Sequence, residues 1–402
     1  MSKYKFPFII LLFLFHTSQI VAQKKYPYNF TEQIDEIYSK NPQKAALEYS
    51  FIGEYKKAIA TYGVDEQPLF NSKEIESIKE KYKAHDAVNY LIKKSKEHQL
   101  MIINEAHHRP RHRLFVHSLL ESLCNQGYNY LALETLCHYK GNACDSDLQS
   151  RGFPLNHYKT GIFTREPQFG NLVRDAIEMG YTIVSYESTN HSDSNEREEN
   201  QAKALAEVFA KDPSAKMLVL CGYDHLIEKK VDPEKNGGKE MWMAGYLKKM
   251  TGINPLTINQ IPLTENIPNK MFFDAFDIKK SSVFINKKDE NDILNNGKAD
   301  ILLAHPAVGS ISERPAWMNL SGYSFFLIND QLTDLVMTPP LLVKAYKSVE
   351  LGDDISPVPV DIIQIQNKEE RKALFLPINE KITLRISNIE GIEKDVEVFT
   401  KK

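Results

Sequence analysis

Five apolar runs of the sequence lead into an ionisable residue, and three of these residues are glutamates. They are Glu105, Glu134, Glu187, His225 and His305. In an open parallel sheet, ligands bind in the crevice beyond the carboxyl ends of the strands. If the five runs are neighbouring parallel strands, three carboxylates and several imidazoles converge in that crevice. Each residue taken alone also fits a solvated loop or a strand cap, and it is their number that favours a site.

Carboxylates that are brought together repel one another, so they need a cation or hydrogen-bonding partners to stay ionised. One solution is a divalent metal such as Zn, Mn, Co or Fe, with Glu105, His107, Glu134 and His225 as ligands. The other is a metal-free His–Glu pair that acts as a general base on a water molecule. The sequence leaves both solutions open.

The densest group of such side chains is segment 105–113, which reads EAHHRPRHR. Side chains alternate along an extended strand end, so Glu105 and His107 share a face. This favours His107 over His108 as the residue that points into the site, and both histidines are kept as candidates.

Three arginines lie in the same segment, around the start of a predicted helix. Pro110 fits the first turn of that helix, so Arg109, Arg111 and Arg113 surround its N-terminus. Free backbone N–H groups, the helix dipole and guanidinium groups favour an anion there, such as a carboxylate or a phosphate. The alternative is a solvated basic loop.

Several well-known catalytic motifs are absent from the sequence. It contains no Gly-x-Ser-x-Gly turn, Walker-type loop, Gly-x-Gly-x-x-Gly after a strand, His-Glu-x-x-His or Cys-x-x-Cys. Their absence disfavours a serine hydrolase and excludes nucleotide-cradling and thioredoxin-like sites.

The elements that must position these residues are short apolar strands alternating with amphipathic helices. Segment 30–98 has a helical period, and strands are then predicted at 100–103, 130–133, 181–186, 217–221, 256–261, 282–285 and 301–304. Helical patterns lie between them at 116–124, 172–179, 198–210 and 241–250. The alternation predicts an α/β fold with a largely parallel sheet flanked by helices. From about residue 357, short β patterns predict a small all-β module.

The N-terminus has the pattern of a secretory signal peptide over residues 1–23. Lys3 and Lys5 precede the apolar run 6–15, and Ala22 lies near a plausible cleavage point. This run is about half of the ~20 residues that a membrane-spanning helix needs, and no later run is long enough. We therefore expect a periplasmic or secreted protein without a transmembrane anchor. Its α/β domain with N-terminal helices would cover 24–350, and its β module 351–402.

Composition agrees with a globular protein of this kind. The 402 residues are 42% hydrophobic and 26% charged, with 50 Lys and Arg against 53 Asp and Glu and a net charge of −3. There is no basic excess of the kind that supports binding to nucleic acid or to a membrane surface.

Four segments, in their order along the chain, resemble the erythromycin esterase/ChaN/Tiki superfamily. They are Asn104-Glu-Ala-His-His, Leu-Ala-Leu-Glu134, Arg197-Glu-Glu-Asn-Gln-Ala and Leu-Cys-Gly222-Tyr-Asp-His225. In that superfamily a Gly-Glu-x-His or Gly-x-x-His element ends the first strand, a Glu ends the next, and a Gly-x-x-His element ends a later one. Asn104 departs from the pattern because glycine is usual there, which puts the tight turn in question. The resemblance covers residues 100–261.

The resemblance implies an α/β site composed of Glu105, His107 or His108, Glu134 and His225, with Arg197 orienting or binding an anion. Members of the superfamily differ in function. Erythromycin esterases hydrolyse a macrolactone with a His-activated water, Tiki-like members resemble metal-dependent peptidases, and ChaN-type members bind haem at the cell surface. Likeness of fold does not select among these activities.

The leading hypothesis is a secreted hydrolase that cleaves an ester, lactone or peptide bond in a small-molecule or peptide substrate. His107 or His225 would be the base or a metal ligand, and Arg109 or Arg197 would hold a substrate carboxylate or an oxyanion. Arg113 and Glu187 are assigned to the substrate side as well. One alternative is a protein that binds haem or another iron ligand, with arginines pairing with propionates. The other is a non-catalytic surface protein with a degenerate site.

Overall fold

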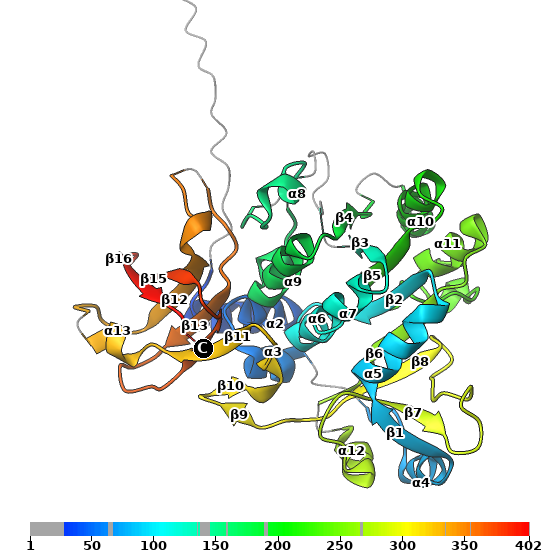
Figure 1. Cartoon of the computed structure of the whole chain (residues 1–402). Helices are drawn as coiled ribbons and strands as arrows, with labels where there is room; N and C mark the ends of the chain where they lie inside the picture. The colour runs from blue at the N-terminus through cyan, green and yellow to red at the C-terminus, as the bar shows by residue number, and fades with distance from the viewer. Residues whose placement is uncertain are drawn as a thin grey trace, which may run out of the picture.

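Eight short strands form the central sheet, and most of their side chains are buried (Figure 1). The computed structural model describes residues 28–62, 67–134, 136, 145–157, 160–188, 192–265, 268–333, 335–353 and 355–401. The strands of this sheet are β1 (Tyr82–Asp86), β2 (Leu100–Glu105), β3 (Tyr128–Leu133), β4 (Thr182–Ser185), β5 (Lys216–Gly222), β6 (Leu256–Thr264), β7 (Ser282–Asn286) and β8 (Ile301–His305).

The strand order in the sheet is β1-β7-β8-β6-β2-β5-β3-β4. Strand β2 runs parallel to both of its neighbours, β5 and β6, and the pairs β3–β5, β3–β4 and β6–β8 are parallel too. All six residues of β2 are buried, as in a parallel strand that is covered on both faces. The predicted α/β fold with a largely parallel sheet is confirmed. Only the pairs β1–β7 and β7–β8 are antiparallel.

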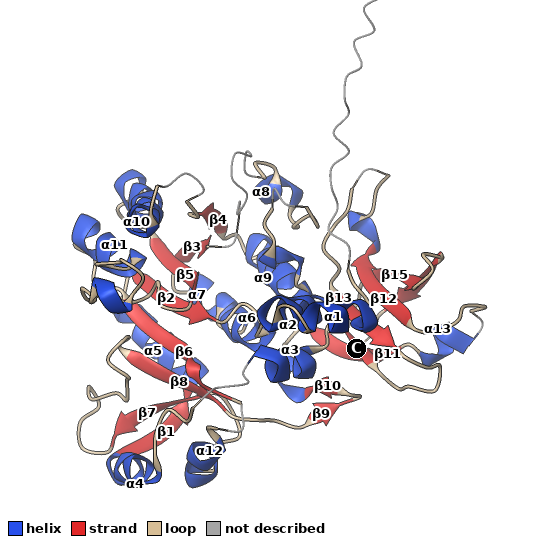
Figure 2. Cartoon of the chain, turned by 180° about the vertical axis from the view of Figure 1, so that it is seen from behind, coloured by secondary structure: helices blue, strands red, loops and turns tan. Residues whose placement is uncertain are grey.

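Helices cover both faces of the sheet (Figure 2). On one face, Met101 and Ile103 pack in a core with Leu120 and Leu172, and on the other face Ile102 packs with residues that include Leu205 and Leu247. The helices of the described ranges are α1 (Thr31–Tyr38), α2 (Pro42–Phe51), α3 (Tyr55–Tyr62), α4 (Ser72–Lys81), α5 (Ala87–Lys94), α6 (Pro110–His117), α7 (Leu120–Cys124), α8 (Leu148–Arg151), α9 (Pro167–Glu178), α10 (Ser194–Lys211), α11 (Met243–Thr251), α12 (Lys270–Phe276) and α13 (Asn329–Thr333).

The N-terminal region is largely helical as predicted, but the expectation of helix throughout 30–98 is wrong at β1. This strand pairs antiparallel with β7 over five residues, from Tyr82 opposite Asn286 to Asp86 opposite Ser282. Exposed and partly buried residues alternate along it with the period of two that a strand requires. Pairing with a strand about 200 residues later in the sequence is a tertiary contact. It outweighs the helical pattern of the neighbouring residues.

The C-terminal part of the chain forms small antiparallel sheets, which confirms the predicted all-β module. A four-stranded sheet has the order β13-β12-β15-β16, and β11 pairs with β14. The strands of this part are β9 (Ser310–Ile311), β10 (Arg314–Pro315), β11 (Tyr323–Leu327), β12 (Leu341–Lys347), β13 (Asp361–Ile365), β14 (Ala373–Pro377), β15 (Lys381–Asn388) and β16 (Glu393–Phe399). Because β12 belongs to this sheet, the expected boundary at 350/351 falls within the sequence that builds it.

The first helices of the chain pack against the C-terminal strands. Phe30, Ile34 and Tyr49 share a core with Leu342 of β12 and Ile362 of β13. Figure 1 shows α2 and α3 beside these strands and next to α6 of the central fold. The first helices that the structure describes and the C-terminal strands therefore share one core.

Among the described residues, no helix is long and apolar enough to cross a membrane. The signal peptide expected over 1–23 lies outside the described residues.

Candidate active site at the carboxyl edge of the sheet

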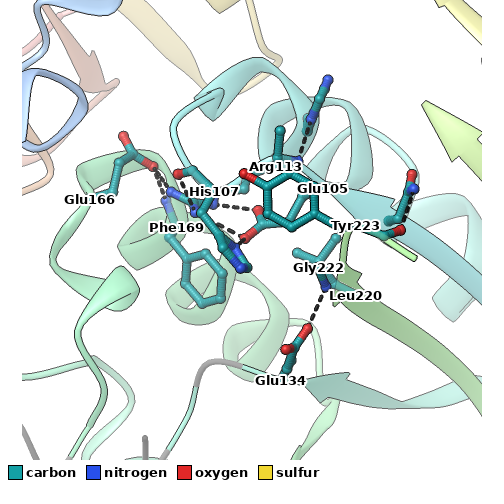
Figure 3. Close-up of polar contacts among 12 residues, drawn as sticks. Glu105, His107, Arg113, Glu134, Glu166, Phe169, Leu220, Gly222 and Tyr223 are labelled. Atoms are coloured by element: carbon teal, nitrogen blue, oxygen red, sulfur yellow. Dashed lines mark hydrogen bonds and ion pairs between the residues drawn. The ribbon is translucent and has the colours of Figure 1, made fainter. Parts of the chain in front are cut away.

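The parallel pairing brings the predicted strand-end residues to one edge of the sheet. Glu105 is in register with Gly222 of β5, and the backbone N–H of Glu134 donates to the carbonyl of Leu220 at 3.3 Å. Figure 3 shows the carboxylates of Glu105 and Glu134 on either side of Gly222. The crevice expected beyond the strands therefore contains the first two glutamates and the Gly222–x–x–His225 turn.

Gly222 allows these groups to come together because it has no side chain. A Cβ atom at this position would lie 2.8 Å from both Cε1 and Nε2 of His107, and 3.1 Å from Oε2 of Glu134. The N–H of Gly222 also donates to the Glu134 carboxylate. The next residue, Tyr223, has a φ of 43°, so the chain turns sharply here. The glycine of this motif is required by close approach of the site residues rather than by its own φ.

His107 is oriented by a buried, ionised carboxylate. Its Nδ1 lies 2.8 Å from Oε1 of Glu105, and Arg113 binds the same carboxylate through Nε at 2.6 Å and Nη2 at 3.0 Å. Burial would raise the pKa of Glu105, but Arg113 and His107 outweigh it and hold that pKa at about 2. Since an ionised carboxylate only accepts, Nδ1 of His107 carries a proton, and in the neutral tautomer of the ring the lone pair is on Nε2, beside Gly222.

The surroundings of His107 are aromatic and partly open. Its ring stacks on that of Phe163, with the ring centroids 4.1 Å apart. It makes an edge-to-face contact with Tyr223, with the centroids 5.4 Å apart. The side chain is 17% exposed, whereas that of Glu105 is 1% exposed. The imidazole is therefore in contact with solvent, whereas the carboxylate behind it is not.

His225 lies between two carboxylates. Its Nδ1 is 2.6 Å from Oε2 of Glu198, and its Nε2 is 3.2 Å from Oε1 of Glu134. Burial would lower the pKa of His225, but the two glutamates raise it to about 10. His225 is therefore an imidazolium at neutral pH. The same interaction, with Arg197, keeps the pKa of Glu134 well below its ordinary value despite burial.

Arg197 connects the third predicted carboxylate to the other two groups. It donates to Glu187 through Nε at 3.0 Å and Nη2 at 2.6 Å, and Nη2 also reaches Glu134 at 2.9 Å. Its Nη1 lies 3.2 Å from Nε2 of His225. The guanidinium is 22% exposed, and the carboxylates raise its pKa. Glu187 thus acts on the site through Arg197.

Arginines offset the repulsion between the clustered carboxylates, for which a divalent metal and a metal-free His–Glu pair were the two expected solutions. Arg113 neutralises Glu105, and Arg197 neutralises Glu134 and Glu187. Each oxygen of Glu105 and Glu134 already accepts from an arginine, a histidine or a backbone N–H. Within the part of the chain that the structure describes, no three His, Cys, Asp or Glu side chains are grouped to hold a metal. As placed, this donor set does not fit a resident metal ion.

Haem does not fit at His225. An axial imidazole needs a free nitrogen, and both nitrogens of His225 have carboxylate partners. Arg113 and Arg197, which would pair with propionates, are engaged by glutamates of the protein.

The other histidine of the pair, His108, is directed elsewhere. Its ring stacks on Tyr62 at 3.8 Å, and its Nε2 accepts from Nε of Arg109 at 3.2 Å. Burial and nearby cations lower the pKa of His108 to about 2, so it is neutral. His107 is therefore the histidine that pairs with Glu105, and Arg109 is 3% exposed beside His108.

His305 ends its strand as predicted but has different partners. It is fully buried, with Nδ1 2.7 Å from Oγ of Ser281 and Nε2 2.8 Å from Oε1 of Gln260. Burial, together with the positive charges of Arg111 and Arg109, keeps its pKa well below the ordinary value.

Sequence reasoning missed two buried glutamates. Glu198 orients His225, and Glu166 accepts from Nη1 of Arg113 at 3.2 Å. Glu198 follows Arg197 in the sequence. The helical pattern that directs Arg197 toward the edge of the sheet also directs Glu198 there, and could have predicted it. Glu166 caps α9 through the N–H groups of Gln168 and Phe169, and nothing local connects it with Arg113.

Asn104, the residue at which the resemblance would expect a glycine, lies within β2 and not in a strained turn. Its Nδ2 donates to the carbonyl of Tyr223 at 2.7 Å and to Oδ1 of Asn259 at 3.0 Å. Its Oδ1 accepts from the N–H of Gln260 at 3.0 Å. The asparagine thus ties the end of β2 to the Gly222 turn on one side and to β6 on the other.

The sequence matches no model of a known protein family and no curated protein. Among solved structures, the type III effector HopBA1 matches with a TM-score of 0.34 and 15% identity, over 56% of this chain and 95% of that one. RRSP, a MARTX toxin effector domain from Vibrio vulnificus CMCP6, matches with a TM-score of 0.31 and 15% identity, over 56% of this chain and 45% of that one. A structure described as bacterial protein toxins matches with a TM-score of 0.30 and 14% identity, covering 56% and 46%.

Proposed function

We propose that this protein is a secreted hydrolase that activates water with His107, with no metal in the catalytic step. The observation that carries the proposal is the contact between Nδ1 of His107 and the buried, arginine-bound carboxylate of Glu105. It leaves the other nitrogen of a partly exposed imidazole with a lone pair, which is the form that a general base requires. The order of motifs that resembles the erythromycin esterase/ChaN/Tiki superfamily supports the same chemistry.

In the first step, Nε2 of His107 takes a proton from a water molecule, and the oxygen of that water attacks a carbonyl carbon. Glu105 holds the imidazole in the required tautomer and stabilises the imidazolium that forms. Arg113 keeps Glu105 ionised, so the carboxylate does not take the proton itself.

The charge that develops on the carbonyl oxygen needs donors at the same edge of the sheet. Arg197 is partly exposed and lies against Glu134 and His225, so it can bind an oxyanion that approaches from the open side. His225, protonated between two carboxylates, is the proton donor to the leaving alkoxide or amine. One histidine acts as base and the other as acid, because His107 has a carboxylate on Nδ1 alone, whereas His225 has a carboxylate on each nitrogen.

The test is a panel of ester, lactone and peptide substrates given to the purified protein with and without a chelator. Against the substrate that is cleaved, we expect His107→Ala to lower kcat by about 10²–10⁴-fold. His85→Ala, at an exposed position on β1, is the matched control and keeps full activity. Activity that survives His107→Ala, or that is abolished by the chelator and restored by one metal, contradicts the proposal.

A further inference from the structure

His305 is the strand-end residue that the proposed hydrolase site does not use, and it lies behind a separate cavity. This cavity has a volume of about 360 Å³, within the range of small-molecule sites. Its apolar wall includes Leu114, Phe115, Val308 and Trp317. The cations Lys279, Lys280 and Arg111 also line it, and they are paired with Asp277, Asp86 and Glu265. Ser281 also lines it.

The hydroxyl of Ser281 is hydrogen-bonded to His305 in a defined direction. Gln260 donates through Nε2 to the carbonyl of Asn104 at 2.6 Å, so its Oε1 faces His305 as an acceptor. Nε2 of His305 must therefore carry the proton, and Nδ1 has the lone pair. Ser281 consequently donates its hydroxyl proton to Nδ1 at 2.7 Å.

A backbone hydrogen bond and burial fix the positions of Ser281, His305 and Gln260. The carbonyl of Ser281 accepts from the N–H of Ala87 at the start of α5, at 3.0 Å. His305 and Gln260 are fully buried on neighbouring strands, β8 and β6. A serine at the wall of a cavity, a histidine behind it and an amide that orients the histidine form the arrangement of an activated nucleophile.

We propose that Ser281, His305 and Gln260 form a second, covalent site that accepts the acyl group of small apolar esters. Oγ of Ser281 forms a bond to the carbonyl carbon, and its proton passes to Nδ1 of His305. His305 returns that proton to the leaving alkoxide as the ester C–O bond breaks. Water then hydrolyses the serine ester, giving back the free hydroxyl and releasing the carboxylic acid.

The surrounding charges define the kind of substrate and the expected speed. Burial and the positive charge of Arg111 lower the pKa of His305, and Arg111 itself is held by Glu265 and by the carbonyl of Pro306. The apolar wall suits a short alkyl or aryl group. Because His305 is a weakened base, we expect slow acylation that is seen best with activated esters and with fluorophosphonates.

The test treats the purified full chain with a small alkyl fluorophosphonate and locates the adduct by mass spectrometry of peptides. The probe forms an Oγ–P bond and loses fluoride, and the serine proton leaves through His305. We expect one adduct, on Ser281, with none in Ser281→Ala. We expect labelling to be about 10²-fold slower in His305→Asn. Ser282→Ala, the neighbouring serine whose hydroxyl bonds to the carbonyl of Lys280, is the matched control and labels normally.

His107→Ala separates this site from the proposed hydrolase site, because it leaves labelling of Ser281 unchanged. Folding of each variant is checked by circular dichroism, so a lost adduct in a folded Ser281→Ala protein supports the proposal. An unlabelled Ser281 in the wild-type protein, or an adduct that persists in Ser281→Ala, overturns it.

Discussion

Nδ1 of His225 lies 2.6 Å from Oε2 of Glu198, a glutamate that has no exposed surface. The same carboxylate oxygen accepts from the backbone N–H of Met243 at 3.0 Å. Glu198 therefore ties the ring of His225 to the start of α11 and leaves only Nε2 to face Glu134 and Arg197. The orientation of His225 follows from a residue behind the site, and this residue adds to the effect of Glu134 in raising the pKa of His225.

Glu198→Gln tests this positioning role. Loss of one anionic partner lowers the pKa of His225 from about 10, so the proton needed by the leaving group is lost at a lower pH. We expect the alkaline limb of the kcat profile to move toward neutral pH, so that the loss of kcat grows as the pH rises above neutrality. Glu199→Gln, the adjacent glutamate on the exposed side of α10, is the control and leaves the profile unchanged. A uniform loss of activity at all pH values would falsify the assignment.

Acid should destabilise the protein through Glu105. Its pKa is about 2 when folded and near its ordinary value of 4.5 when unfolded, so the unfolded chain binds the proton first as the pH falls. The stabilisation is present above pH 4.5 and is lost between about 4.5 and 2. It amounts to about 3 kcal/mol of the free energy of unfolding.

Urea unfolding measured between pH 7 and pH 3 checks this dependence. Glu105→Gln removes the titrating group and leaves Arg113 buried beside Glu166 alone. We expect this variant to be less stable at pH 7, by about 3–5 kcal/mol, and to lose less stability on acidification. Equal acid sensitivity of the variant and the wild-type protein is the contrary result.

Gly222→Ala should damage the site more than the fold. The added methyl group would overlap the imidazole of His107 and press on Glu134, so one of them must move away from the turn. We expect a cost of about 1–3 kcal/mol in the free energy of unfolding and a large loss of kcat. Gly309→Ala, where nothing lies within 4 Å of the new Cβ, is the control. Wild-type kcat in a folded Gly222→Ala protein would contradict the proposed place of His107.

Arg197→Lys keeps the positive charge and removes the bidentate hydrogen bonding to Glu187. A lysine ammonium cannot bind Glu187 through two nitrogens and also reach Glu134, so one carboxylate loses its partner. We expect kcat to fall about tenfold or more, with a smaller change in KM, because the lost donor acts on the developing oxyanion. Arg385→Lys, in an exposed pair with Asp395 on the C-terminal sheet, serves as the control. An unchanged kcat for Arg197→Lys would remove Arg197 from the chemistry.

The sequence by itself determined the α/β class, the main strands and the residues at their carboxyl ends. These follow from local properties: apolar runs form buried strands, and a residue that ends such a run lies at the sheet edge whatever surrounds it. The pairing of His107 with Glu105 was also readable, because side chains two residues apart share a face of an extended chain. The strand β1 was hidden, because its pairing with β7 depends on residues 200 positions away.

Only the tertiary structure decided how the carboxylates are neutralised and which strand-end residues meet. Glu105, Glu134 and His225 come together because β2, β3 and β5 are neighbours, whereas His305 lies at the far side of β6 and pairs with Ser281. Arg113, which the sequence assigned to the substrate, is instead fully buried between Glu105 and Glu166. Which opposite charge a buried side chain pairs with depends on distance and burial in the folded chain. Neither quantity can be read from the spacing of residues along the sequence.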